Sequence, residues 1–209
     1  MTARSAVFAS SVCLILLGAA SAFAQSSAPR ETVQTRVGRA QVSIEYGRPA
    51  LKGRNVASLM KQLPDDRMWR AGAEEVTTLT ATAPVSLGGK ILPAGKYSLY
   101  VHCPDEGPYS LAVNRDLGQP LKKVWAAAPP QVADAPYPHF NYRSEIGSQE
   151  VLRVPMKRTA GNDAVDLFTI SLTPGDAGAY LKMAWGDQVW SLDLQPAASA
   201  RTMPEGSHF

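Results

Sequence analysis

The chain has 209 residues, of which 45% are hydrophobic, and a formal net charge of +3 at pH 7. This length suits one domain whose hydrophobic core is stable without disulfides or structural metals. The weak and dispersed positive charge argues against a nucleic-acid-binding protein, which would gather basic residues on one face.

The first 24 residues have the pattern of a secretory signal peptide. Arg4 precedes an apolar stretch rich in small residues, and Ala22-Phe23-Ala24 forms an A-x-A cleavage site. The alternative is an uncleaved membrane anchor, but the most apolar run, VCLILLGAA, is far shorter than the ~20 residues that span a bilayer. We therefore expect an exported protein, periplasmic or secreted, whose mature chain begins at Gln25 and contains no membrane span.

Only Cys103 remains after cleavage at that site, so no intrachain disulfide can form. The residue directly follows the strand-like segment YSLYVH, a position typical of a small buried side chain. A catalytic thiol would need a helix N-terminus or a basic partner to lower its pKa, and the sequence shows neither.

Alternation of apolar and polar residues dominates the mature chain. In QVSIEYG, Val42, Ile44 and Tyr46 fall on one face of a strand. Further strands are predicted at residues 32–38, 76–82, 96–102, 109–114, 150–156, 166–172, 180–186 and 188–194. Short strands bounded by Gly, Pro, Asn and Asp indicate a mainly β, antiparallel sandwich, jelly-roll-like, in a single domain covering residues 25–195.

Turn residues mark where these strands reverse. Gly186-Asp187 predicts a hairpin between the last two strands, and Gly88-Gly89 predicts another reversal. The motif LPAGKYSL, with Gly95 and Tyr97, resembles the tyrosine corner of sandwich domains, in which the Tyr hydroxyl bonds back to a turn.

One short helix is predicted, in NVASLMKQLP, residues 55–64, where apolar residues recur at helical spacing before Pro64. We expect it to close one end of the sandwich. Four prolines between Pro129 and Pro138 make the segment 126–148 an irregular surface loop. Residues 196–209 lack an apolar pattern and are predicted to be a disordered tail.

Taken in order, the blocks IEYGRPALKGR, MWRAGAEEVTTLT, GGKILPAGKYSLYV, YSLAVNRDLGQ and VLRVPM resemble the bacterial domain-of-unknown-function 2911 family. The closing segments DLFTISL and LKMAWGDQVWSLDL fit the same family, so the resemblance covers about residues 29–194. It implies an exported protein of a Gram-negative bacterium with a β-rich domain, in a family without an established biochemical activity. The proline-rich segment at 126–140 is longer here than in the family pattern, so a function carried by that loop would not transfer.

A basic turn, GRPALKGR, carries three cations, Arg48, Lys52 and Arg54. Such a loop can bind a carboxylate, phosphate or sulfate, for which the arginine fork is well suited. The alternative is structural, with the cations paired to Glu74, Glu75 or Asp66.

The segment WRAGAEE supplies the other half of the candidate site, with Trp69, Arg70, Glu74 and Glu75 around Gly72. A sugar can stack on an aromatic ring while its hydroxyls bond to charged neighbours. A Trp that closes the end of a sandwich core would look the same in sequence. A binding site requires an exposed Trp69, whereas a structural role requires a buried one.

The sequence predicts no metal site and no cofactor. Only His102, His139 and His208 remain in the mature chain, without metal-binding spacing, and no nucleophile elbow or phosphate loop occurs. Adjacent carboxylates such as Glu74 and Glu75 face opposite ways on an extended chain, so they cannot form the carboxylate pair of a glycosidase.

The favoured interpretation is a monomeric, non-catalytic binding module of the cell envelope for a small anionic or sugar-like ligand or for a peptide of a protein partner. A second hypothesis is a carbohydrate-active enzyme with Glu74 or Glu75 as acid/base. A third is a purely structural envelope protein.

Overall fold

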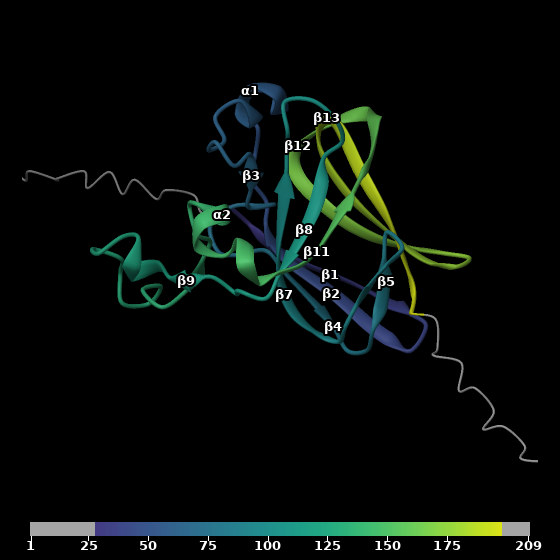
Figure 1. The fold of residues 1–209 in the computed structure, drawn as a ribbon. Coiled ribbons are helices and arrows are strands. Elements are labelled where there is room, and N and C mark those ends of the chain that lie inside the picture. Colours follow the sequence, from purple (N-terminus) through teal and green to yellow (C-terminus); the bar gives the residue numbers. More distant parts are fainter. Residues whose placement is uncertain (1–27, 198–209) are drawn as a thin grey trace, which may run out of the picture.

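The computed structural model describes residues 28–197, in which two antiparallel β-sheets pack against each other and a third, two-stranded sheet lies outside them (Figure 1). The predicted signal peptide and residues 198–209 of the predicted tail lie outside this range. The prediction of a mainly β, antiparallel sandwich is confirmed.

The first sheet has the order β1-β2-β4-β7-β8-β11, with β3 paired to β7. Its strands are β1 (Arg30–Val37), β2 (Ala40–Gly47), β3 (Met68–Trp69), β4 (Thr78–Ala81), β7 (Gly95–His102), β8 (Ser110–Asn114) and β11 (Glu150–Pro155). The second sheet has the order β12-β13-β5-β6. Its strands are β5 (Val85–Leu87), β6 (Lys90–Leu92), β12 (Lys157–Gly175) and β13 (Gly178–Pro196).

The core lies between the sheets, as the alternation predicts. Val42, Ile44 and Tyr46 are fully buried, and so are the inward residues of the second sheet. Tyr100 breaks the pattern, because it lies on the opposite face of β7 from Leu99 and is nevertheless buried. A second, smaller apolar cluster covers this outer face: Met68, Tyr100, Ala112, Tyr142 and Ile146.

The chain reverses direction within β13, so this element consists of two antiparallel halves. A Cβ placed on Gly178 would lie 2.2 Å from the carbonyl oxygen of Leu194, so the two ends of β13 are side by side. The reversal falls at Gly186-Asp187, where Gly186 has a φ of +58°. A positive φ at the first central residue is what a type II′ hairpin requires, so the predicted hairpin is present and glycine is the residue that makes it.

Two other predicted turns also occur in the structure. Gly88 and Gly89, between β5 and β6, have φ values of +53° and +85°, which suit a two-residue hairpin. Near the start of β7, the Tyr97 hydroxyl donates a hydrogen bond to the carbonyl of Pro93 in the preceding turn at 3.1 Å. This contact ties the start of β7 to the preceding turn.

Residues 28–197 contain two short α-helices where the sequence predicts one. Helix α1 (Val56–Met60) lies within the predicted segment, and the Asn55 side chain caps it by accepting a hydrogen bond from the backbone of Ser58 at 2.8 Å. Helix α2 (Tyr142–Glu145) lies within the segment predicted to be irregular. Its single turn has no helical sequence period, and it is held by tertiary contacts instead.

Candidate functional site

Residues 115–149 form an ordered insert between β8 and β11. It contains β9 (Gln119–Pro120), η1 (Leu121–Lys123), β10 (Pro136–Tyr137), α2 and η2 (Gly147–Gln149). Its backbone closes on itself through a hydrogen bond from Leu121 N to the carbonyl of Ala135 at 3.0 Å. The prediction of an irregular loop at 126–148 is therefore wrong in part, because these backbone bonds join residues far apart in sequence.

The insert docks directly beside WRAGAEE. The backbone N–H of Val76 donates to the carbonyl of Pro136 at 2.8 Å, which places β10 against the end of that segment. Gly118, with a φ of +96°, permits the approach: a Cβ there would lie 2.7 Å from the Tyr137 carbonyl oxygen and 2.8 Å from Val76 Cγ2. Another residue at position 118 would push the insert away from the sheet.

A groove of about 740 Å³ lies between WRAGAEE and the insert. We call it the outer groove. Trp125 and Phe140 are its most exposed aromatic side chains, with 51% and 60% of their surface accessible. Its lining residues are Arg70, Glu74, Glu75, Leu121, Val124, Trp125, Val132, Ala135, Tyr137 and Phe140.

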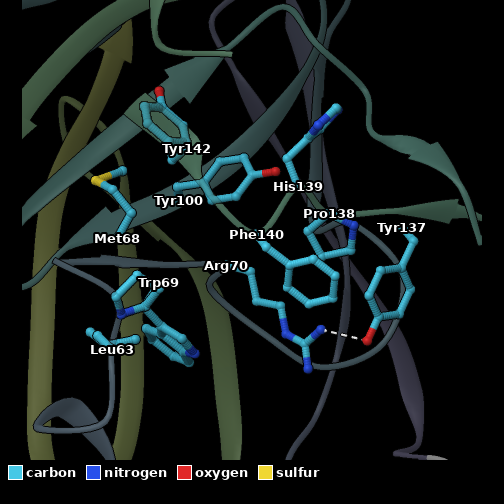
Figure 2. Close-up of a pocket in the computed structure, with 11 residues that line it drawn as sticks. Leu63, Met68, Trp69, Arg70, Tyr100, Tyr137, Pro138, His139, Phe140 and Tyr142 are labelled. Atoms are coloured by element: carbon cyan, nitrogen blue, oxygen red, sulfur yellow. Dashed lines mark hydrogen bonds between the residues drawn. The ribbon is translucent and has the colours of Figure 1, made fainter. Parts of the chain in front are cut away.

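A second space of about 240 Å³, the inner cavity, adjoins the outer groove. Arg70, Tyr137 and Phe140 line both spaces. Figure 2 shows Arg70 extending toward Tyr137, to whose hydroxyl its Nη1 donates a hydrogen bond at 2.9 Å. The remaining lining of the inner cavity is Leu63, Pro64, Met68, Trp69, Tyr100, Pro138, His139 and Tyr142.

The two carboxylates of WRAGAEE each have a partner outside the outer groove. Glu75 forms an ion pair with Arg30, with Oε2 and Nη1 2.9 Å apart. Glu74 accepts a hydrogen bond from the backbone N–H of Ala28 at 3.0 Å. Both carboxylates line the groove, but their charge is in part directed toward the N-terminal segment of the chain.

Trp69 belongs to the core. Only 8% of its surface is accessible, and its ring stacks on Trp185 with 5.3 Å between ring centroids and 11° between ring planes. It also meets Phe168 edge-on at 4.8 Å. Its position is the one that a structural role requires, and the groove takes its aromatic surface from other residues.

The basic turn faces the edge of the second sheet. Arg48 donates to the carbonyl of Phe168 at 3.1 Å and pairs with Glu31, with Nη1 and Oε2 2.8 Å apart. Arg54 donates to two carbonyls of its own turn, those of Leu51 and Ala50, at 2.9 and 3.0 Å. The structural alternative expects these arginines to pair with Glu74, Glu75 or Asp66. That expectation is wrong, because the pairing of β1 with β2 brings Glu31 to this end of the sheet, where it pairs with Arg48.

Lys52 is exposed, and its backbone N–H donates to Asp166 Oδ1 at 3.1 Å. No cavity described above is lined by the basic turn. Of the seven candidate residues, the structure thus brings Arg70, Glu74 and Glu75 together at one groove. It places Trp69 beneath the inner cavity, and Arg48, Lys52 and Arg54 at a different edge of the molecule.

The backbones of the two motifs nevertheless touch. A Cβ on Gly47 would lie 2.2 Å from the carbonyl oxygen of Ala73, and one on Gly72 would lie 3.0 Å from the carbonyl oxygen of Gly47. Ala71 and Glu74 have φ values of +51° and +60°, a region that side chains other than glycine seldom occupy. Such backbone strain clusters at functional sites, and of these two residues Glu74 lines the outer groove.

Buried polar contacts hold α2 and the inner cavity in place. The Asn114 side chain donates to the Tyr142 hydroxyl at 3.1 Å and to the carbonyl of Ile146 at 2.9 Å. The Tyr142 hydroxyl donates to Glu150 at 2.8 Å. Burial raises the pKa of Tyr142 and of Tyr100 well above the ordinary value, so both hydroxyls keep their protons.

His139 contacts two carboxylates within the insert. Its Nδ1 lies 2.7 Å from Glu145 Oε2, and its Nε2 lies 3.2 Å from Asp116 Oδ1. The hydrogen bond with His139 is the main cause that lowers the pKa of the Glu145 carboxyl. The contact with Asp116 is close in distance only, since Nε2 makes no hydrogen bond of good geometry within the described chain.

Residues 28–197 contain no cluster of three His, Cys, Asp or Glu side chains suited to holding a metal ion. Within that same range, no helix has the length and apolar character needed to cross a bilayer. Cys103 is buried beside the core, and burial raises the pKa of its thiol to about 12.

Sequence reasoning missed Trp125 and Phe140. A usable pattern was present, because Trp125, Tyr137, Phe140 and Tyr142 fall within one short segment of a chain that is only 8% aromatic. Aromatic residues concentrated in a proline-rich loop are a sign of an exposed binding surface, since loops carry most binding residues.

The fold and the groove define a two-sheet antiparallel β protein that carries a groove on an insert between β8 and β11. The chain belongs to the family described as "Protein of unknown function (DUF2911)", whose family model matches residues 28–194. The resemblance predicted from the sequence is thereby confirmed. Comparison with curated proteins and with solved structures gave no match.

Proposed function

We propose that this protein is a non-catalytic binding module for a sugar-like ligand, which it holds in the outer groove. The observation that carries the proposal is the pair of exposed aromatic rings, Trp125 and Phe140, in a groove that also contains Arg70 and Glu74. Aromatic side chains seldom remain this exposed in a concave surface unless they contact a partner.

The groove has the size and composition of a ligand site. Its volume of about 740 Å³ lies within the range of roughly 300–1,000 Å³ that is usual for such pockets. Apolar side chains make up most of its lining, and a few polar groups lie at one wall. A pyranose ring presents an apolar face to an aromatic ring and hydroxyls at its rim, and both kinds of partner are present here.

The contacts of Glu74 and Glu75 favour binding over catalysis. A glycosidase needs a carboxyl that exchanges a proton with the substrate, and normally two carboxyls on opposite sides of the scissile bond. Glu75 is occupied by Arg30, and Glu74 accepts the backbone N–H of Ala28. These contacts give both side chains a role in fixing the groove wall.

We further propose that binding takes place outside the cytoplasm, in the periplasm or after secretion. This part of the proposal rests on the predicted signal peptide at residues 1–24, with its A-x-A site at Ala22-Phe23-Ala24. A ligand derived from the cell envelope would meet the protein there.

Isothermal titration of residues 25–209 with soluble oligosaccharides tests the proposal. Trp125→Ala and Phe140→Ala should each weaken binding, by roughly tenfold or more, because each removes a stacking surface. Tyr180→Ala is the matched control, since this ring is similarly exposed, at 46%, but does not line the groove. Absence of binding to every oligosaccharide, or an equal loss in the control variant, would contradict the proposal.

A peptide segment of a protein partner is the second candidate ligand. Leu121, Val124 and Val132 add aliphatic surface to the groove that a sugar does not need. If this candidate is correct, a library of apolar peptides should bind the protein, Trp125→Ala should reduce that binding, and the oligosaccharides should not compete.

A further inference from the structure

We infer that the ligand of the outer groove carries a carboxylate, that Arg70 binds this carboxylate, and that the ligand class is therefore acidic sugars of the uronic-acid type. This inference deepens the function proposed above and rests on it. The feature that carries it is the unused hydrogen-bonding capacity of the Arg70 guanidinium.

Arg70 differs from the other half-buried arginines of the protein. A guanidinium has five N–H donors, and a half-buried one normally uses several of them. Arg48 donates hydrogen bonds to the carbonyl of Phe168 at 3.1 Å and to Thr169 Oγ1 at 2.7 Å, and it forms an ion pair with Glu31 at 2.8 Å. Arg70, in contrast, makes one hydrogen bond to any residue in the described range, from Nη1 to the Tyr137 hydroxyl, and no ion pair there.

The charge of Arg70 is not neutralised by the carboxylates that share its groove. Glu75 pairs with Arg30 at 2.9 Å, and Glu74 accepts a hydrogen bond from Ala28. The groove thus presents one carboxylate paired with Arg30, one carboxylate that accepts a backbone N–H, and one cation whose hydrogen bond goes to a neutral phenol. The ligand group that complements this arrangement is an anion at Arg70.

The surroundings of Arg70 strengthen such a contact. Tyr137 and Phe140 line both spaces beside the guanidinium, and Trp69 and Tyr100 line the inner cavity. Aromatic walls exclude water, and an ion pair in a partly desolvated site is stronger than one in bulk solvent. The guanidinium fork also matches a carboxylate in a bidentate geometry that an ammonium group cannot reproduce.

A uronic acid meets both requirements of the site at once. Its carboxylate is attached directly to the pyranose ring, so a ring stacked on an aromatic side chain carries the carboxylate only one bond away. Arg70 and Phe140 line the same two spaces, so a ring that contacts Phe140 can place its acid group at the guanidinium. A neutral sugar would leave the cation in the site without a partner.

Titration with matched ligands tests the inference. The probes are short oligomers of glucuronate, galacturonate and mannuronate, each beside its methyl ester, which keeps the ring and removes the charge. At least one acid should bind wild type about 10- to 100-fold more tightly than its ester, as expected for charge-assisted hydrogen bonds. Binding of the acid should also weaken as salt is raised.

Two substitutions at one position separate charge from geometry. Arg70→Gln should abolish the preference for the acid over the ester, because it weakens binding of the acid far more than binding of the ester. Arg70→Lys should recover only part of the loss, because an ammonium group lacks the planar fork. Arg54→Gln is the matched control, since Arg54 bonds only its own turn and lies outside the groove.

The outcomes distinguish this inference from the function on which it rests. Equal affinity for acid and ester, or binding of neutral oligosaccharides with no uronate bound, would overturn the acidic class and leave the sugar-binding function standing. Failure of all uronates, esters and neutral oligosaccharides to bind would overturn both. Equal losses of affinity for the acid and the ester in Arg70→Gln would assign Arg70 to the structure of the groove and overturn its role in selecting the acid.

Discussion

Replacement of Trp69 by alanine tests whether the most conspicuous residue of WRAGAEE supports the fold or binds ligand. Trp69 is 92% buried, since 8% of its surface is accessible, and it packs on Trp185 and Phe168. Truncation of a buried Trp to Ala costs about 3–5 kcal/mol of unfolding free energy. We expect the lower part of that range, because Trp69 borders the inner cavity and water can enter the space left behind.

For a domain of this size, a loss of about 3–4 kcal/mol corresponds to a decrease in melting temperature of roughly 6–16 °C. Urea unfolding followed by far-UV circular dichroism measures the free energy directly. Trp125→Ala is the matched comparison: the same substitution at a half-exposed ring should change stability by at most about 0.5 kcal/mol. A cost below about 1 kcal/mol for Trp69→Ala, or similar costs for the two variants, would refute the division between core and groove aromatics.

Three further predictions concern polar groups. Tyr97→Phe removes the hydrogen bond to the Pro93 carbonyl and should lower the unfolding free energy in urea by about 1 kcal/mol; an unchanged midpoint would show that this bond does not stabilise the fold. Since the bond with His139 lowers the pKa of Glu145, the stabilisation by Glu145 is present above its unfolded pKa of about 4.3 and is lost as pH falls through the lower folded pKa. The urea midpoint of wild type should therefore exceed that of Glu145→Gln at neutral pH and approach it in acid, whereas a constant difference would contradict this origin. Burial raises the pKa of the Cys103 thiol to about 12, so iodoacetamide at mildly alkaline pH should label Cys103 only after unfolding, and rapid labelling of the folded protein would contradict its burial.

The strands were predictable because their physical cause is local. A strand between two sheets buries every second residue, and this period is visible in the letters of the sequence. The inward positions even change parity between Trp185 and Trp190, both of which are buried. That change follows from the reversal at Gly186-Asp187, since in a straight strand the buried residues would remain all odd-numbered or all even-numbered.

The site was only partly predictable, because its parts are assembled by contacts between distant residues. The bond between Val76 and Pro136 brings the insert to WRAGAEE, and nothing near either residue in sequence indicates the other. The partner of Arg48 was within reach, however. In the β1–β2 hairpin, Glu31 lies opposite Tyr46, and Tyr46 comes two residues before Arg48. The hairpin register alone therefore places the Glu31 carboxylate at the end of β2 from which the basic turn begins.

The pairing of β5 with the last residues of β13 has a consequence for how the chain folds. Val85 and Leu87 lie opposite Pro196 and Leu194 in the register of the sheet, so the β5–β6 hairpin near the middle of the chain obtains its neighbour from the final strand. Contacts between such distant segments form slowly, because a long loop must close first. The second sheet is therefore incomplete until residue 196 has been synthesised. Deletion of Leu194, Gln195 and Pro196 would leave β5 paired with β6 alone and expose its other edge.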